Sequence, residues 1–265
     1  MDLKLEGKRV LVTGSTGGIG EGIAKHFARE GAAVIINGRR EKEAERVAGE
    51  INEANGKAIV AVGDLSKDED VNKVVEIAEK ELGGIDILIN NAAGGAAHEQ
   101  DLAIPTKDWL SSYNINVLSM VRLIKLILPK MQKQGWGRII NISSASGTKP
   151  APGMDVYSTT KAAVNNLTVT LAQSMGDDAV TINTISPGAI FSGAMANMFF
   201  KNGIAPTVDE ARDLLNQMGS DSIPFERVGE VEEVADVVVF LASPLASYVH
   251  GANIRIDGGY VPTVN

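Results

Sequence analysis

The chain has 265 residues, 44% of them hydrophobic, and 25 basic against 33 acidic side chains give a net charge of −8. This length and composition predict one large α/β domain, and the acidic balance argues against nucleic acid or an anionic membrane as a partner. Cysteine is absent, which excludes disulfides, thiolate metal sites and thiol catalysis. The first residues lack the apolar segment of a signal peptide, and no apolar run is long enough to span a membrane. We therefore expect a cytoplasmic protein, and no motif indicates a bound metal.

A glycine-rich turn follows the first expected strand. Residues 9–13 are a short β-branched run, residues 14–20 (Gly-Ser-Thr-Gly-Gly-Ile-Gly) come next, and a helical pattern of apolar residues begins at Ile23. Glycines allow a backbone to approach a pyrophosphate closely, and a helix N-terminus offers N–H groups and a positive dipole. The alternative is that the glycines serve only a tight strand-to-helix turn. In this context the segment predicts a phosphate site for a nucleotide cofactor.

The end of the second expected strand, at 33–37, indicates the kind of dinucleotide. In an NAD site an acidic residue at this place binds the adenosine ribose hydroxyls. Here Asn37 and Gly38 stand at that place, and Arg39 and Arg40 follow. Because arginine suits a 2′-phosphate, the sequence favours NADP(H) over NAD(H). The alternative is that both arginines are simply solvated at the start of a helix.

The rest of the chain continues the alternation of strands and helices. Further strands are expected at 58–62, 85–89, 138–143, 180–185 and 252–256, and helices at 41–54, 67–82, 106–134, 156–175 and 231–242. Four β–α repeats in the first 94 residues predict a doubly wound parallel sheet. No repeat or linker is evident, so residues 1–265 are expected to form a single domain.

Two loop segments leave their roles open. The segment 189–226 carries a methionine and phenylalanine cluster at 195–200, which fits either a core or a mobile cover over a substrate. His98 lies in the loop 94–105, where a histidine is more commonly a surface residue than a catalytic one.

Tyr157 and Lys161 are four residues apart at the start of the helix expected at 156–175. This spacing places the phenol and the ammonium on one face of the helix, one turn apart. A neighbouring cation favours phenolate, so we expect the pKa of Tyr157 to lie below the free value of about 10. Ser144, at the end of the strand 138–143, could hydrogen-bond a substrate oxygen. Alone the pair is weak, but beside a nucleotide site it predicts acid–base chemistry on a carbonyl or an alcohol.

Taken together, these motifs resemble the short-chain dehydrogenase/reductase family across almost the whole chain. The segment 13–20 resembles its cofactor loop, Asp64 stands where the family contacts adenine, and 90–92 resembles its Asn-Asn-Ala-Gly segment. The sequence departs from that segment at Ala93, since glycine comes one residue later, at Gly94. The pair 187–188 resembles the turn beside the nicotinamide, and Ser192 replaces a more usual threonine.

The resemblance implies a Rossmann-type sheet of about seven strands and a catalytic tetrad of Asn116, Ser144, Tyr157 and Lys161. By it, Tyr157 is the general acid or base, Lys161 lowers the pKa of Tyr157 and binds the nicotinamide ribose, and Ser144 polarises the carbonyl. Asn116 would hold a water that relays protons to Lys161, or serve a structural role only. The implied cofactor contacts are Gly14, Ser15, Thr16, Gly18, Ile19, Gly20, Arg39, Asp64, Leu65, Asn91, Tyr157, Lys161, Pro187, Gly188, Ile190 and Ser192.

We therefore expect an NADP(H)-dependent reductase of small ketones or aldehydes, or a dehydrogenase of secondary alcohols. The nearest alternative is a 3-oxoacyl-thioester reductase acting on a carrier-bound substrate, which a basic patch at the site mouth would favour. A non-catalytic nucleotide-binding module would be expected to show a broken tetrad. The apolar faces of 117–128 and 157–172, which the family usually pairs across subunits, predict a homotetramer.

Overall fold

The expected alternation of strands and helices forms one parallel sheet. The computed structural model describes residues 2–94, 104–176, 179–220 and 222–263, so His98 lies outside the described residues. The strand order is β3-β2-β1-β4-β5-β6-β9, and every neighbouring pair is parallel. The strands are β1 (Arg9–Val12), β2 (Ala33–Gly38), β3 (Lys57–Val62), β4 (Ile87–Asn90), β5 (Gly137–Ile142), β6 (Val180–Pro187) and β9 (Asn253–Ile256). The prediction of a doubly wound sheet of about seven strands is confirmed.

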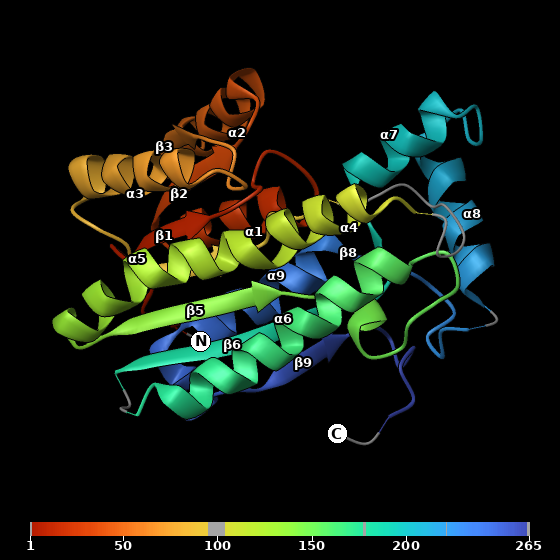
Figure 1. Cartoon of the computed structure of the whole chain (residues 1–265). Coiled ribbons are helices and arrows are strands. Elements are labelled where there is room, and N and C mark those ends of the chain that lie inside the picture. The colour runs from red at the N-terminus through yellow and green to blue at the C-terminus, as the bar shows by residue number, and fades with distance from the viewer. Residues whose placement is uncertain (1, 95–103, 177–178, 221, 264–265) are drawn as a thin grey trace.

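Helices cover both faces of this sheet (Figure 1). One hydrophobic core joins the sheet to α1 (Gly18–Arg29), α2 (Glu41–Glu53) and α9 (Val231–Ala242). The other joins it to α3 (Asp68–Leu82), α5 (Ser119–Gln134) and α6 (Asp155–Ser174). Successive residues of a strand point to opposite faces, so Val10 and Val12 enter the first core and Leu11 the second. This is why the strands read as continuous apolar runs.

The order of the strands places the site. From β1 the chain builds outward to β2 and β3, and it then returns to add β4, β5, β6 and β9 on the other side of β1. Ligands of such sheets bind outside the carboxyl ends of the strands where this reversal occurs. The loops that follow β1 and β4 therefore border the expected crevice.

The helical region 106–134 is not one regular helix, as the sequence pattern suggested. It consists of α4 (Thr106–Tyr113), a π-helix (Asn114–Leu118) and α5. The five-residue π turn holds one residue more than an α turn would. A reason is visible at Asn116, which is fully buried in this turn and makes hydrogen bonds with both ends of its side-chain amide.

The segment after β6 forms a small unit of its own. Its base is a pair of two-residue strands that the sequence did not reveal, β7 (Ile190–Phe191) and β8 (Gly229–Glu230). Between them, α7 (Gly193–Lys201) and α8 (Val208–Ser220) project beyond the end of the sheet toward which β5 points (Figure 1). Phe199 is buried in a core shared with Phe191 and Val228. For this phenylalanine, the core interpretation of the cluster at 195–200 is confirmed.

Short 3₁₀ turns at Ala145–Gly147 and Pro244–Ala246 complete the secondary structure of the described ranges. Nowhere in these ranges is a helix both long and apolar enough to cross a membrane.

Candidate active site

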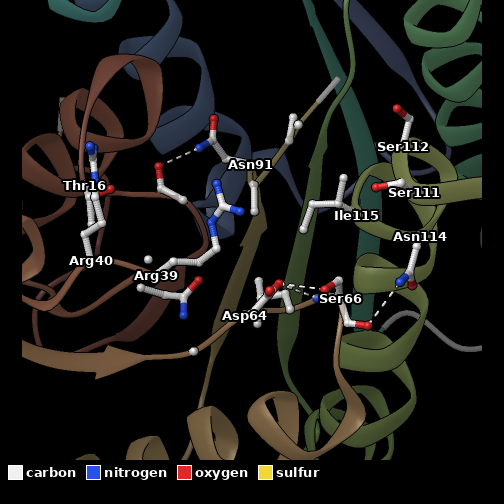
Figure 2. A pocket seen from close by; sticks show the side chains of 18 of the residues that line it. Thr16, Arg39, Arg40, Asp64, Ser66, Asn91, Ser111, Ser112, Asn114 and Ile115 are labelled. Carbon is white, nitrogen blue, oxygen red and sulfur yellow. Dashed lines mark hydrogen bonds between the residues drawn. The ribbon is translucent and has the colours of Figure 1, made fainter. Parts of the chain in front are cut away.

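A cavity of about 1270 Å³ opens at the carboxyl ends of the first four strands. Its walls are the loops that follow β1, β2, β3 and β4 on one side, and α4 with the π-helix on the other. Figure 2 shows side chains from these segments around the opening. The cavity therefore lies where the strand order predicts a ligand.

The glycine loop is built for close approach of its neighbours. Gly14 has φ +62°, a conformation that L side chains rarely adopt, and a Cβ on it would lie 2.9 Å from the Cα of Ala92. A Cβ on Gly20 would collide with the Gly14 carbonyl and the Asn91 amide. At the start of α1, the loop backbone is therefore not covered by side chains of its own at these two positions. This is the arrangement that a pyrophosphate needs, so the residues present fit a dinucleotide.

Hydrogen bonds join the glycine loop to the loop that follows β4. The Thr13 hydroxyl oxygen accepts from the backbone N–H groups of Asn91 and Ala92, both at 2.9 Å. The Asn91 amide donates in return to the carbonyls of Thr13 (2.9 Å) and Gly14 (3.2 Å; Figure 2). The two loops at the switch point therefore behave as one piece, with Asn91 at its centre.

Three predicted cofactor contacts have their side chains elsewhere. The Ser15 hydroxyl is fully buried, donates to the Val12 carbonyl at 2.7 Å and accepts from the Asn37 N–H at 3.0 Å. Ile19 and Ile190 pack in or against the core of the first sheet face. None of the three lines the cavity, and the side chains of Ser15 and Ile190 are buried, whereas Ile19 is half-buried.

The end of β2 presents two cations to the cavity. Arg39 and Arg40 are exposed and line it, beside Asn37 and Gly38. In Figure 2 the Arg39 guanidinium reaches over the middle of the opening, between Asn91 and Asp64. This end of the strand carries no carboxylate.

Asp64, in the loop that follows β3, lies on the same wall and is held ionised. Burial alone would raise the pKa of its carboxyl, but two hydrogen bonds from Ser66 and the charges of Arg39 and Lys67 outweigh burial and lower it. The Ser66 bonds are 2.8 Å from the hydroxyl and 3.1 Å from the backbone N–H. The predicted pair Asp64 and Leu65 therefore borders the cavity, with Leu65 largely buried.

The wall formed by α4 and the π-helix escaped the sequence analysis. It contributes Asp108, Ser111, Ser112, Asn114 and Ile115. The Asn114 amide donates to the Ser66 carbonyl at 3.2 Å and so joins this wall to the loop after β3 (Figure 2). No local pattern signals the contact, because the two residues are 48 positions apart.

Ser144, Tyr157 and Lys161 come together at the carboxyl end of β5. Ser144 begins the 3₁₀ turn, and its hydroxyl accepts from the Ser146 N–H at 3.1 Å. Tyr157 lies in the first turn of α6 and is hydrogen-bonded to Ser144. The Lys161 Nζ lies 5.5 Å from the centroid of the Tyr157 ring. The Ser143 hydroxyl donates to the Lys161 carbonyl at 3.0 Å and fixes α6 against the strand end.

The expected lowering of the Tyr157 pKa does not occur in this structure. Burial raises the pKa of the Tyr157 phenol, and the hydrogen bond with Ser144 opposes this only in part. Burial likewise lowers the pKa of Lys161 from 10.5 to about 8. Desolvation disfavours the charged form of each group. Here it outweighs the attraction between the Lys161 cation and a Tyr157 phenolate on which the expectation rested.

Asn116 contacts neither Tyr157 nor Lys161 through a hydrogen bond of its side chain. Its Oδ1 accepts from the Gly94 N–H at 2.9 Å, and its Nδ2 donates to the Thr160 hydroxyl at 3.0 Å. The glycine that comes one residue late in the sequence thus has a defined partner. Both ends of the amide are used, which favours the structural interpretation of this residue.

Comparison with known proteins agrees with this geometry. Residues 14–261 match the family model described as enoyl-(acyl carrier protein) reductase. A 3-oxoacyl-(acyl-carrier-protein) reductase of Aquifex aeolicus is 38% identical over 98% of this chain and 99% of its own length. The 7α-hydroxysteroid dehydrogenase of Escherichia coli K12 is 33% identical over 100% of this chain and 98% of its own length. The chain belongs to the short-chain dehydrogenase/reductase family.

Two solved structures extend the likeness. A 7α-hydroxysteroid dehydrogenase complexed with NADH and 7-oxo glycochenodeoxycholic acid has a TM-score of 0.87 and 32% identity, covering 100% of this chain and 98% of that one. L-Sorbose reductase from Gluconobacter frateurii, complexed with NADPH and L-sorbose, has a TM-score of 0.93 and 30% identity, covering 100% of both chains. As a member of this family, the protein is an oxidoreductase that acts on hydroxyl or carbonyl groups.

In this short-chain dehydrogenase/reductase, the turn after β6 also lies at the glycine loop. A Cβ on Gly18 would lie 3.8 Å from the Ser192 hydroxyl oxygen. The Gly188 N–H donates to the Ile256 carbonyl at 2.9 Å, and a Cβ on Gly188 would lie 2.9 Å from the Cα of Asp257. Pro187 and Gly188 are therefore fixed against the segment that follows β9.

Proposed function

We propose that this protein is an NADP(H)-dependent oxidoreductase that transfers a hydride between the nicotinamide and a small ketone, aldehyde or secondary alcohol. The observation that carries the proposal is the meeting of Ser144, Tyr157 and Lys161 at the end of β5, in a fold whose bare glycine loop fits a dinucleotide. The relatives solved with NADH or NADPH support a nicotinamide cofactor.

When bound, the nicotinamide would supply the hydride for reduction or accept it in oxidation. In reduction, the Tyr157 hydroxyl would give its proton to the carbonyl oxygen of the substrate. Ser144 donates a hydrogen bond to the same oxygen, and Lys161 stabilises the phenolate that Tyr157 becomes. Asn116 acts through the packing of Gly94 and Thr160, or holds a water of the proton relay as the family resemblance implies.

The preference for NADP(H) rests on Arg39. The relatives differ, since one was solved with NADH and another with NADPH. Arg39 and Arg40 line the cavity at the end of β2, where no acid stands to repel a 2′-phosphate. A guanidinium can bind this phosphate with two parallel hydrogen bonds.

A second candidate is a 3-oxoacyl-thioester reductase of fatty-acid synthesis. The 38% identity to the Aquifex aeolicus enzyme favours it. The region around the expected mouth holds Lys107, Lys201 and Arg212 without a clear basic cluster, and Arg212 is paired with Glu230. We therefore rank a free small substrate first. A non-catalytic nucleotide-binding module is the remote alternative, which the presence of all four expected tetrad residues in the sequence disfavours.

We further propose a cytoplasmic homotetramer built from single domains of residues 1–265, without nucleic acid, membrane or metal partners. Apart from Leu118, the apolar residues of 117–128 are buried or half-buried within the chain itself. The support comes instead from exposed apolar residues on α4, the π-helix and α6, namely Leu110, Tyr113, Leu118 and Val169. The segment 189–226, with α7 and α8, is proposed to cover the substrate at the carboxyl end of the sheet.

The decisive experiment is a substrate panel read through the absorbance of reduced nicotinamide. Ketones, aldehydes and acetoacetyl thioesters, both free and carrier-bound, are each assayed with NADPH and NADH, and secondary alcohols with NADP⁺ and NAD⁺. Turnover of free carbonyls with NADPH supports the first candidate. A kcat/KM that is high only for the carrier-bound thioester would replace it with the second, and binding of nucleotide without turnover of any compound would favour the module.

A further inference from the structure

A bidentate ion pair joins α1 to α2 beside the glycine loop. The Arg46 Nη2 lies 2.8 Å from the Glu21 Oε2, and its Nη1 lies 3.2 Å from the Glu21 Oε1. Arg46 also bonds Glu50 on its own helix at 2.7 Å, and Lys25 bonds both Glu21 (2.6 Å) and Glu50 (2.7 Å). The Arg46 Nε also lies 3.5 Å from the Glu43 Oε2, so Arg46 is at the centre of a five-residue charge network.

Glu21 is the one acidic residue in the first turn of α1. Burial would raise the pKa of its carboxyl, but hydrogen bonds from Arg46 and Lys25 outweigh burial and lower it, so Glu21 is ionised at neutral pH. A negative charge in the first turn interacts favourably with the positive end of the helix dipole. The same negative charge repels phosphates bound at that helix end, unless neighbouring cations neutralise it.

Arg46 also contacts the cavity wall itself. Its Nη2 donates to the Thr16 carbonyl in the glycine loop at 3.4 Å. Thr16 lines the cavity, and its side chain stands against Gly38 at the end of β2, where a Cβ would collide with the Thr16 methyl group. The guanidinium therefore contacts the part of the glycine loop that faces the end of β2, next to Arg39 and Arg40.

We propose that Arg46 is a positioning residue for dinucleotide binding, which shields the bound phosphates from the Glu21 carboxylate and holds the Thr16 carbonyl in place. The inference rests on the proposed function, because it places phosphates at the glycine loop. The more negative NADPH gains more from the shielding than NADH does. Since exposed ion pairs contribute little to stability, loss of Arg46 affects affinity much more than it affects folding.

The test measures Kd for NADPH and NADH by fluorescence titration, with the thermal midpoint as a check on folding. Arg46→Met is expected to weaken NADPH binding about three- to tenfold, which is less than the loss of a direct charge-assisted contact would cause, because Arg46 acts through Glu21 and Thr16. NADH binding is expected to weaken by less. The double variant Glu21→Gln with Arg46→Met recovers part of the NADPH affinity, because the Glu21 carboxylate, which keeps only Lys25 as a partner in Arg46→Met, is then absent. Lys42→Met, which removes an exposed cation of the same helix, leaves both Kd values unchanged.

Three results would overturn the inference. They are an unchanged Kd in Arg46→Met, an equal loss for both nucleotides that Glu21→Gln does not relieve, and a loss of the same size in Lys42→Met. A wild-type protein that prefers NADH contradicts the proposed cofactor instead. In that case, the effect of the same variants on NADH binding still decides the role of Arg46.

Discussion

The buried Nζ of Lys161 donates a 2.8 Å hydrogen bond to the carbonyl oxygen of Ile142, the last residue of β5. The bond ties the ammonium to the strand that leads to Ser144. Among the hydrogen bonds and ion pairs of the described residues, none gives Lys161 a carboxylate partner. The backbone carbonyl of Ile142 therefore orients this lysine, and burial of its charge lowers the stability of the folded protein.

That cost should appear in the pH dependence of unfolding. The Lys161 pKa is about 8 when folded and 10.5 when unfolded, so the unfolded state binds more protons between these values. Wild-type stability then rises with pH across this window. Below pH 8, burial of the charge lowers wild-type stability by about 3 kcal/mol. Lys161→Met removes this cost but also loses the hydrogen bond to Ile142, which contributes about 1 kcal/mol. We expect Lys161→Met to be more stable at pH 7 by up to about 2 kcal/mol.

Urea unfolding at several pH values between 7 and 10 measures this difference. The advantage of Lys161→Met should shrink as the pH rises through the window. The raised pKa of Tyr157 lowers the stability of the folded protein only above about pH 10. This effect lies outside the pH range in which the two proteins are compared. Parallel curves for the two proteins would show that the lysine is not desolvated as described.

Tyr157→Phe should abolish most turnover while leaving the affinity for the cofactor unchanged. The change deletes one oxygen and leaves the glycine loop, Arg39 and Lys161 intact. General acid–base catalysis contributes about 10²–10⁴-fold, so kcat should fall by at least about 10²-fold with an unchanged NADPH Kd. Lys161→Ala should instead lower both kcat and cofactor affinity. More than about a tenth of wild-type kcat in Tyr157→Phe would rule out the general-acid assignment.

Arg39→Ala should remove the preference for NADPH. One charge-assisted contact is worth roughly 1.5–3 kcal/mol, hence about tenfold to hundredfold in kcat/KM for NADPH relative to NADH. The rate with NADH should stay close to wild type. Lys42→Ala serves as the matched control, since it removes a nearby exposed cation that does not line the cavity. If wild type already uses NADH as well as NADPH, Arg39 has no such role.

The proposed tetramer predicts a mass near four chains by light scattering at micromolar concentration. Val169, which is 47% exposed on α6, is expected at a subunit contact. Val169→Glu would bury a charge there and should lower the mass. Val208→Glu is the control, because Val208 is equally exposed at 47% but lies on α8. A monomeric wild-type protein would refute the assembly.

Lys149 joins the segment that follows Ser144 to the C-terminal segment around Tyr260. The Lys149 Nζ donates to the Tyr260 carbonyl at 3.1 Å and lies 3.7 Å from the centroid of the Tyr260 ring. The backbone N–H of Lys149 donates to the carbonyl of Ala145, the residue after Ser144. Lys149→Met should raise the KM for the carbonyl substrate about threefold to tenfold and leave the NADPH Kd unchanged. Lys149→Arg, which keeps the cation over the ring, should restore it. Equal changes in both constants would indicate general loosening.

Local spacing explains what the sequence could predict. Tyr157 and Lys161 are one helical turn apart in any α-helix, and the glycines of 14–20 directly follow a strand, so both features need no tertiary knowledge. The alternation of strands and helices likewise determined the sheet. The order in which the strands assemble then brought these motifs to one edge.

The remaining features depend on packing between distant segments. The Asn114 contact with Ser66 arises only when the π-helix approaches the loop after β3. The Ser15 hydroxyl could be assigned to the protein interior only once Asn37 was seen beside it. The direction of the Tyr157 pKa depends on its burial, which spacing along one helix does not reveal.

The π-helix carries one residue more than a continuous α-helix needs between α4 and α5. The wider turn takes up this residue, so removing one residue from 114–118 would leave enough chain for an α-helix and would change the orientation of α4 relative to α5 only slightly. Asp108 and Ser111 would therefore stay in the cavity wall. The wide turn that places the Asn116 amide between Gly94 and Thr160 would be lost. A single deletion here is thus expected to preserve the fold and to remove the link between the loop after β4 and α6.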